Sequence, residues 1–188
     1  MRIGVITESE GESRVAIAPS SIRKLSKAGY EVAIQEGAGN LSNYSDQDYS
    51  DAGAIVVDRE EALKSPFLIC VRFPEGVDFF EGQVIACIAD PFRHPERIKF
   101  CNSRKATLLS MDMIPRRLSR AQSMDVNSSQ DNLAGYKAVL LGASMVPKGI
   151  PMMTTSAGTV RPAKVVIMGS GVAGLQAIAT AKRLGAVV

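Results

Sequence analysis

The sequence predicts an α/β protein in which a domain built on a parallel sheet is followed by the start of a second domain of the same class. Two observations lead to this prediction. From Met1 to about Ser110, short β-branched runs alternate with amphipathic stretches, which is the pattern of parallel strands joined by helices. Further along, a β-branched run at 164–168 leads directly into a glycine-rich turn and an alanine-rich helical pattern.

The strands of the first domain are short runs bounded by Gly, Pro, Ser or Asp residues. They are expected at 3–6, 31–35, 54–57, 67–71, 84–88 and 106–109. A helix is expected at 20–28, because Pro19 precedes this stretch and Gly29 ends it. A second, shorter helix is expected within 45–53, where N-cap and C-cap residues enclose the segment.

The chain changes character after Met111, where a proline and three arginines precede a long helical stretch that runs to about Ala143. We expect this helix to connect two domains, because a stretch rich in proline and glycine at 147–151 breaks the chain beyond it. The expected organisation is an N-terminal α/β domain at 1–118, a connecting helix at 119–146 and the incomplete start of a second domain at 147–188.

Composition excludes several classes of function. The formal net charge is only +3 and no basic block stands out, so no nucleic-acid partner is expected. The apolar runs are far shorter than the roughly 20 residues that cross a bilayer, and the first residues form a strand pattern rather than a secretory leader. We therefore expect a cytoplasmic protein with no membrane span. Cys70, Cys87 and Cys101 lack metal-ligand spacing and are expected to be reduced and buried.

The glycine-rich turn has the spacing of a dinucleotide-binding loop. The pattern G-x-G-x-x-G is weak by itself, but here it follows a strand pattern at 164–168 and opens a helical pattern at 175–184. The first glycine permits the tight turn, the second lets the backbone approach a phosphate, and the third lets the helix lie close to the strand. The sequence thus predicts a Rossmann-like unit for an NAD-type cofactor, with glycines that serve packing alone as the alternative. The expected contacts are Gly169, Ser170, Gly171, Val172, Ala173 and Gly174.

The motif leaves the choice between NAD and NADP open. The acidic residue that binds the ribose usually lies about 20 residues past the motif, beyond Val188. After the helical pattern only the opening of a further strand, 186–188, is expected. A non-catalytic binding module therefore stays an alternative to an enzyme.

The segment 115–129 is dense in hydrogen-bond donors and acceptors, which favours a binding function. Two structural interpretations are equally consistent with the pattern. Ser119 and Gln122 have the spacing of a capping box, so the glutamine could cap a helix. The three arginines of the segment, at 116, 117 and 120, could form a solvated face.

The sequence at 120–125, Arg-Ala-Gln-Ser-Met-Asp, and at 132–136, Asn-Leu-Ala-Gly-Tyr, resembles the NAD(H)-binding alpha subunit of proton-translocating NAD(P) transhydrogenases. The resemblance continues through 165–188. It also includes the pattern Glu-Ser-Arg-Val-Ala at 12–16, which these subunits share with alanine dehydrogenases. Two departures are visible, because the family usually has Pro in place of Ile6 and often has Ala or Gly in place of Ser170.

The resemblance implies a set of functional residues. A mobile loop of the family holds the nicotinamide with an Arg, a Gln and an Asp, which by motif are Arg117, Gln122 and Asp125, and Ser128 matches a further cofactor contact. These residues would act by positioning NAD(H) for Re/Si-specific hydride exchange with NADP(H) on a partner subunit, so no proton-transferring side chain is required.

The resemblance also implies partners and a location. Membrane and NADP-binding transhydrogenase subunits would couple hydride transfer to proton translocation. The protein would be cytoplasmic and peripheral to the membrane through these subunits. An apolar face expected on 164–188 further suggests a homodimer.

An alanine-dehydrogenase-like enzyme is the second interpretation. Such enzymes need a substrate-binding Lys after the fourth strand and a His after the fifth, but the stretches at 70–74 and 86–90 contain neither. The lone histidine, His94, is expected on a surface loop, with a displaced active-site group as the alternative. Arg14 would bind the substrate carboxylate in those enzymes, and here it is expected to have a structural role.

Overall fold

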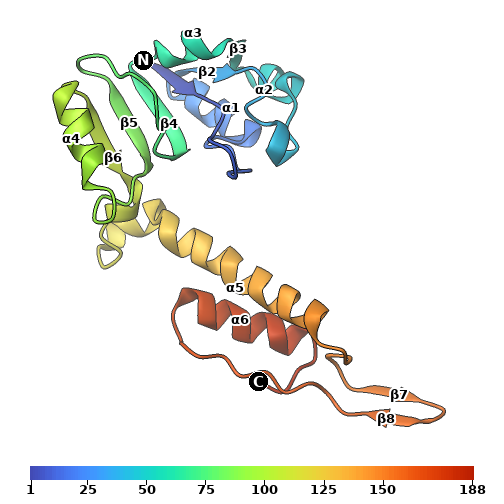
Figure 1. The fold of residues 1–188 in the computed structure, drawn as a ribbon. Coiled ribbons are helices and arrows are strands. Elements are labelled where there is room, and N and C mark those ends of the chain that lie inside the picture. Colours follow the sequence, from blue (N-terminus) through green and yellow to red (C-terminus); the bar gives the residue numbers. More distant parts are fainter. The chain divides into compact units, whose positions relative to one another are not determined.

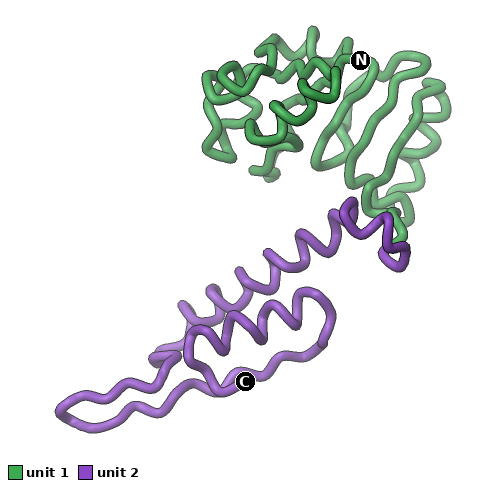
Figure 2. The backbone as a smooth tube through the Cα atoms, turned by 180° about the vertical axis from the view of Figure 1, so that it is seen from behind, with its two compact units in different colours: residues 1–115 green, residues 116–188 purple.

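The computed structural model describes residues 1–188, which form two compact units, 1–115 and 116–188 (Figure 2). The helix expected to connect two domains lies inside the second unit, because it packs along the last helix of the chain. The domain boundaries expected from the sequence, at 118 and 146, remain predictions.

The first unit contains a six-stranded sheet in which every neighbouring pair is parallel (Figure 1). Its strands are β1 (Arg2–Val5), β2 (Glu31–Gln35), β3 (Ile55–Val57), β4 (Phe67–Arg72), β5 (Val84–Ile88) and β6 (Thr107–Ser110). The order β3-β2-β1-β4-β5-β6 reverses direction between β1 and β4, as in doubly wound nucleotide-binding folds. The predicted α/β, Rossmann-like class is confirmed.

The helices of the first unit are α1 (Pro19–Lys27), α2 (Asp46–Ala52), α3 (Arg59–Leu63) and α4 (Pro95–Ser103), with 3-10 turns η1 (Asn40–Ser42) and η2 (Met111–Met113). The first two are the expected ones. α1 begins at its proline, and α2 begins with a capping box between Ser45 and Asp48. Sequence reasoning missed α3 and α4, because α3 has only five residues and α4 buries only Cys101.

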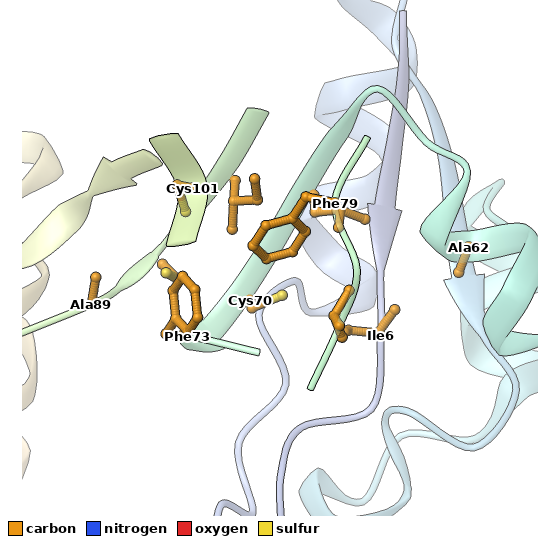
Figure 3. Close-up of a cluster of buried hydrophobic side chains, with 11 residues drawn as sticks. Ile6, Ala62, Cys70, Phe73, Phe79, Ala89 and Cys101 are labelled. Atoms are coloured by element: carbon orange, nitrogen blue, oxygen red, sulfur yellow. The ribbon is translucent and has the colours of Figure 1, made fainter. Parts of the chain in front are cut away.

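The core of the first unit consists of two clusters of buried side chains. One cluster contains Phe73 and Phe79 together with all three cysteines (Figure 3). Cys70, Cys87 and Cys101 are unpaired and buried, which confirms their expected core role. Burial raises the pKa of each thiol, in the case of Cys87 to about 12, so none of them is a ready nucleophile.

The second unit contains η3 (Ser119–Met124), α5 (Val126–Met145), β7 (Met153–Thr155), β8 (Gly158–Val160) and α6 (Val172–Arg183). β7 and β8 form an antiparallel hairpin that the sequence patterns did not predict. No helix of the structure combines the length and the apolar character that a membrane-spanning segment needs.

The strand expected at 164–168 is not formed, and this expectation is wrong. A single parallel bridge joins Lys164 to Val187, and Val166 and Met168 are 86% and 96% exposed. A parallel strand is stable when neighbours on both sides satisfy its backbone and cover its side chains. Residues 164–168 make this one bridge and belong to neither of the two sheets.

Candidate functional site

The glycine-rich turn has the backbone geometry that its motif predicts. Gly169 has a φ of 111°, a conformation that side-chain-bearing residues rarely adopt. Gly174 lies in the first turn of α6, where an added Cβ would lie 2.8 Å from the carbonyl carbon of Gly169 and nearer still to its oxygen. Both glycines are therefore required for the chain to turn closely into α6.

Gly171 differs from these two, because an added Cβ would meet no atom within 4 Å. It is the N-cap residue of α6, and because glycine has no side chain, no side-chain hydrogen bond caps the helix. Ser170 and Val172 on either side of it are exposed or nearly so, and Ala173 is half-buried. The open space at Gly171 thus lies at the place where the motif predicts that a ligand approaches.

The N-terminus of α6 favours an anion. The first N–H groups of a helix lack intrahelical partners and carry partial positive charge. The first turn of α6 contains no acidic residue, whereas Lys182 and Arg183 lie in its last turn. A pyrophosphate would therefore meet no competing carboxylate from the first turn of this helix.

Asp125 is the N-cap residue of α5, the helix that follows the donor-rich segment. Its carboxylate accepts hydrogen bonds from the backbone N–H of Ser128 at 2.9 Å and from the Ser128 hydroxyl at 2.6 Å. These bonds hold the pKa of Asp125 below its usual value, so the group is ionised at neutral pH. Asp125 and Ser128, both expected cofactor contacts, are thus direct partners.

The capping box that Ser119 and Gln122 could form is absent. The N-cap residue of η3 is Leu118, and no side chain caps this turn. The side chains of Arg117 and Gln122 are exposed. Structural capping therefore does not explain Gln122, and its side chain is accessible to a ligand.

Arg116 is the arginine that pairs with the acidic residues at the start of α5. Its Nε lies 3.7 Å from the Asp125 carboxylate, and its Nη2 lies 3.4 Å from that of Asp131. Because the Arg116 side chain is half exposed, these pairs are weak. The family resemblance assigns the neighbouring Arg117 to the nicotinamide and gives Arg116 no role.

α5 and α6 lie side by side and run in the same direction (Figure 1). Gly135 of α5 meets Ala173 at the start of α6, and residues later in both helices line one common cavity. The expected site residues therefore form two groups in one unit, one at the start of each helix. Ser128 and Gly135 are seven residues apart, which corresponds to about 10 Å along α5.

Gly135 is a residue that sequence reasoning missed. It is the one buried residue of α5, and a Cβ there would lie 2.9 Å from the carbonyl carbon of Ala173. A signal was available, because glycine inside a helical pattern costs about 1 kcal/mol relative to alanine and usually has a packing or functional reason.

The cavity between α5, α6 and residues 163–167 has a volume of about 340 Å³. Lys164 is its only charged lining residue, and the glycine-rich turn does not line it. The remaining lining is made by Ala, Val, Ile, Leu and Gly residues. This cavity is an apolar packing surface and not the expected phosphate site.

The first unit contains a cavity of about 260 Å³ at the carboxyl ends of β1, β2 and β4. In doubly wound sheets this reversal point is the usual ligand site. Glu8 lines it, and its carboxylate accepts hydrogen bonds from the backbone N–H groups of Val71 at 2.6 Å and Arg72 at 3.0 Å. Burial raises the pKa of Glu8 in spite of these bonds.

Glu12 binds two arginines, Arg14 and Arg72, whereas Arg59, which lines the cavity, donates to Gln35. The Arg14 guanidinium donates to the two Glu12 oxygens at 2.7 and 2.6 Å, and Arg72 donates to the same carboxylate at 3.2 Å. The bonds from Arg14 lower the pKa of Glu12 to about 2. Arg14 therefore serves the structure through Glu12, as expected. His94 precedes α4, where its Nδ1 lies 2.9 Å from the carboxylate of Glu96, and it does not line the cavity.

Comparison with known proteins identifies the family. Residues 4–134 match the family model "Alanine dehydrogenase/PNT, N-terminal domain", and residues 138–188 match "Alanine dehydrogenase/PNT, C-terminal domain". This chain belongs to the alanine dehydrogenase/PNT family. The resemblance found in the sequence is confirmed.

Within the alanine dehydrogenase/PNT family, transhydrogenase alpha subunits are more similar to this chain than alanine dehydrogenases are. An NAD(P) transhydrogenase subunit alpha protein of Rhodospirillum rubrum is 44% identical over the whole chain, which covers 52% of that protein. The crystal structure of transhydrogenase from Sinorhizobium meliloti superposes with a TM-score of 0.96 at 44% identity, covering 100% of this chain and 55% of that one. For an L-alanine dehydrogenase structure the TM-score is 0.86 at 29% identity, covering 99% and 53%. The chain thus spans about half the length of these relatives.

Proposed function

We propose that this chain belongs to the NAD(H)-binding component of a proton-translocating, Re/Si-specific NAD(P) transhydrogenase. One observation carries the proposal: a single unit holds an uncapped helix start at the glycine-rich turn and, on the helix packed beside it, the Asp125–Ser128 pair. The greater similarity to transhydrogenase alpha subunits than to alanine dehydrogenases supports the same conclusion.

The pyrophosphate of NAD(H) would bind at residues 169–174. The positive φ of Gly169, the open space at Gly171 and the absence of acidic residues in the first turn of α6 all fit an anion there. The residues present therefore suit the cofactor that the family implies. NADP(H) would be held by the partner subunit.

The nicotinamide would lie near the start of α5. The exposed amide of Gln122 can pair with the carboxamide of the ring, since it offers both a donor and an acceptor. Asp125 is held in one orientation by Ser128. Arg117 supplies an exposed positive charge in the segment before α5. When bound, the cofactor supplies the hydride. The contribution of Arg117, Gln122 and Asp125 is to orient the ring, because direct transfer between two nicotinamides requires no side chain to exchange a proton.

The partners follow from the same proposal. Membrane and NADP-binding subunits would complete the enzyme and keep this component in the cytoplasm, peripheral to the membrane. A homodimer is part of the same proposal.

Alanine dehydrogenase activity is the second candidate, because the first unit has a cavity at the reversal point of its sheet. The contacts of Glu12 argue against it. Arg14 and Arg72 both bind this one carboxylate, so neither is arranged primarily for a substrate carboxylate. A non-catalytic binding module is a third candidate that the same experiments address.

The test uses the full-length protein that contains this chain. Calorimetry with NADH and NADPH should show clear preference for NADH, and addition of the partner subunits should give hydride transfer between NADH and an NADP analogue. Tighter binding of NADPH, or oxidation of NADH that depends on pyruvate and ammonia, would refute the proposal. Binding of NADH without hydride transfer in the complete assembly would favour the binding module.

A further inference from the structure

α5 and α6 meet at one point through backbone atoms alone. Gly135 faces Ala173, and a Cβ at Gly135 would lie 2.9 Å from the carbonyl carbon and 3.0 Å from the Cα of that residue. Real Cβ atoms rarely approach other atoms this closely, and backbone atoms cannot rotate away as a side-chain end can. The absence of a side chain at Gly135 is therefore a requirement of the observed helix spacing.

The contact continues into the glycine-rich turn. Ala173 precedes Gly174, which packs in the same way on the carbonyl group of Gly169. Two successive contacts to backbone thus connect the middle of α5 to the turn that opens α6. Because neither contact involves a flexible side chain, a displacement at Gly135 is transmitted to the turn.

The other end of this connection is the start of α5. Asp125 and Ser128 are hydrogen-bonded to each other there, and α5 continues without interruption through Gly135 to Met145. The rise from Ser128 to Gly135 is about 10 Å. One rigid helix therefore spans the separation between the expected nicotinamide contacts and the expected pyrophosphate contacts.

We propose that Gly135 is a positioning residue that sets the spacing between the two halves of the dinucleotide site. This inference rests on the proposed NAD(H)-binding function. A methyl group at 135 forces the start of α6 away from α5, and a misplacement of about 1 Å can cost about a hundredfold in rate when a reaction depends on orientation.

The same helix provides a matched control. Gly142 also lies within α5, and an added Cβ there would meet nothing within 4 Å. Alanine is a better helix former than glycine at both positions. Gly142→Ala thus introduces the same change in helix propensity without touching α6.

The experiment compares Gly135→Ala and Gly142→Ala in the full-length protein, with calorimetry of NADH and of ADP-ribose, which lacks the nicotinamide. For Gly135→Ala we expect NADH affinity to fall at least tenfold and ADP-ribose affinity to fall clearly less. Gly142→Ala should leave both affinities unchanged. Unchanged NADH affinity in Gly135→Ala, or an equal loss of affinity for both ligands, would overturn the inference.

If Gly135→Ala does not fold, the same two affinities are measured in a double variant with Ala173→Gly, which frees the first turn of α6 to move around the new methyl group. The same unequal loss is expected, and equal losses would again overturn the inference. A wild-type protein that binds no NADH would instead refute the proposed function, so the two failures are distinguishable.

Discussion

The two units differ in how the polar groups at their candidate ligand sites are paired. At the reversal point of the sheet in the first unit, Glu8 accepts hydrogen bonds from the backbone N–H groups of Val71 and Arg72, and Glu12 binds Arg14 and Arg72. At the start of α6 in the second unit, no side chain caps the helix and no acidic residue lies in the first turn. A binding site is thus decided less by the fold than by which polar groups are left without an intramolecular partner.

The largest effect on NADH binding is expected from adding a carboxylate at the start of α6, so that its N–H groups are bound by a side chain as those near Glu8 are. Gly171→Asp places a carboxylate at the N-cap of α6, where the added side chain has free space. Because aspartate caps helices well and competes with a pyrophosphate, we expect NADH affinity to fall about a hundredfold or more while the melting temperature is kept or raised. Calorimetry and thermal unfolding test this.

Gly171→Ser is the control for this change, since serine caps the helix without charge and should reduce affinity much less. If Gly171→Asp bound NADH as tightly as the wild type, the uncapped start of α6 would not be the anion site. The contrast between the two units would then have no functional meaning.

The next effect is expected at Asp125. Asp125→Asn keeps a good N-cap but removes the charge, so the melting temperature should change little. Hydride transfer in the assembled enzyme should slow about tenfold or more, because the orienting carboxylate is lost. Asp131→Asn is the matched control, since Asp131 also pairs with Arg116 but is not among the expected cofactor contacts. A parallel loss of rate and stability in Asp125→Asn would favour a purely structural cap.

A smaller effect is expected on the stability of the first unit, where Glu12 is paired with arginines. The pKa of Glu12 is lowered to about 2 in the folded protein, so its contribution to stability is present above the unfolded value near 4.5 and is lost as pH falls toward 2. Glu8 has the opposite sign, because its raised pKa favours the folded state only at low pH. Glu12→Gln should therefore lower the free energy of unfolding by about 1 kcal/mol at neutral pH.

Urea unfolding between about pH 7 and pH 3 checks this prediction. The difference in the free energy of unfolding between wild type and Glu12→Gln should shrink as the pH falls. A difference that is independent of pH would mean that Glu12 acts through packing and not through its charge.

The smallest effect distinguishes two adjacent arginines. Arg116→Gln should change stability by less than about 0.5 kcal/mol, because its ion pairs are long and half exposed. Arg117→Gln should weaken NADH binding several-fold with no change in stability. If instead Arg116→Gln alone weakened NADH binding, the expected assignment of Arg117 would have to move by one residue.

Local patterns in the sequence predicted much of the fold and the glycine-rich turn. The strands β2 and β5 match the expected ranges, because their β-branched runs are closed by turn residues on both sides. Gly169 and Gly174 are required by a turn whose constraints lie within a few residues. The capping of α5 by Asp125 is equally local, although the sequence pattern pointed to Ser119 and Gln122 instead.

Other features depend on contacts between residues far apart in sequence. The β-branched run at 164–168 has the pattern of a strand, but a strand requires a ladder of partners, and this run makes one bridge, from Lys164 to Val187. The role of Gly135 depends on α6, which begins at Val172. Nothing near Glu12 in sequence reveals that Arg72 shares its carboxylate.

The sequence by itself therefore determined the fold class, the glycine-rich turn and the buried cysteines, because each follows from periodicity, turn chemistry or composition over a short stretch. Only the tertiary structure decided which charges are already paired, where α5 and α6 touch, and that the run at 164–168 makes a single bridge instead of a strand ladder. These properties depend on distances across the fold, and hydrogen bonds, ion pairs and backbone contacts are all sensitive to a few tenths of an ångström.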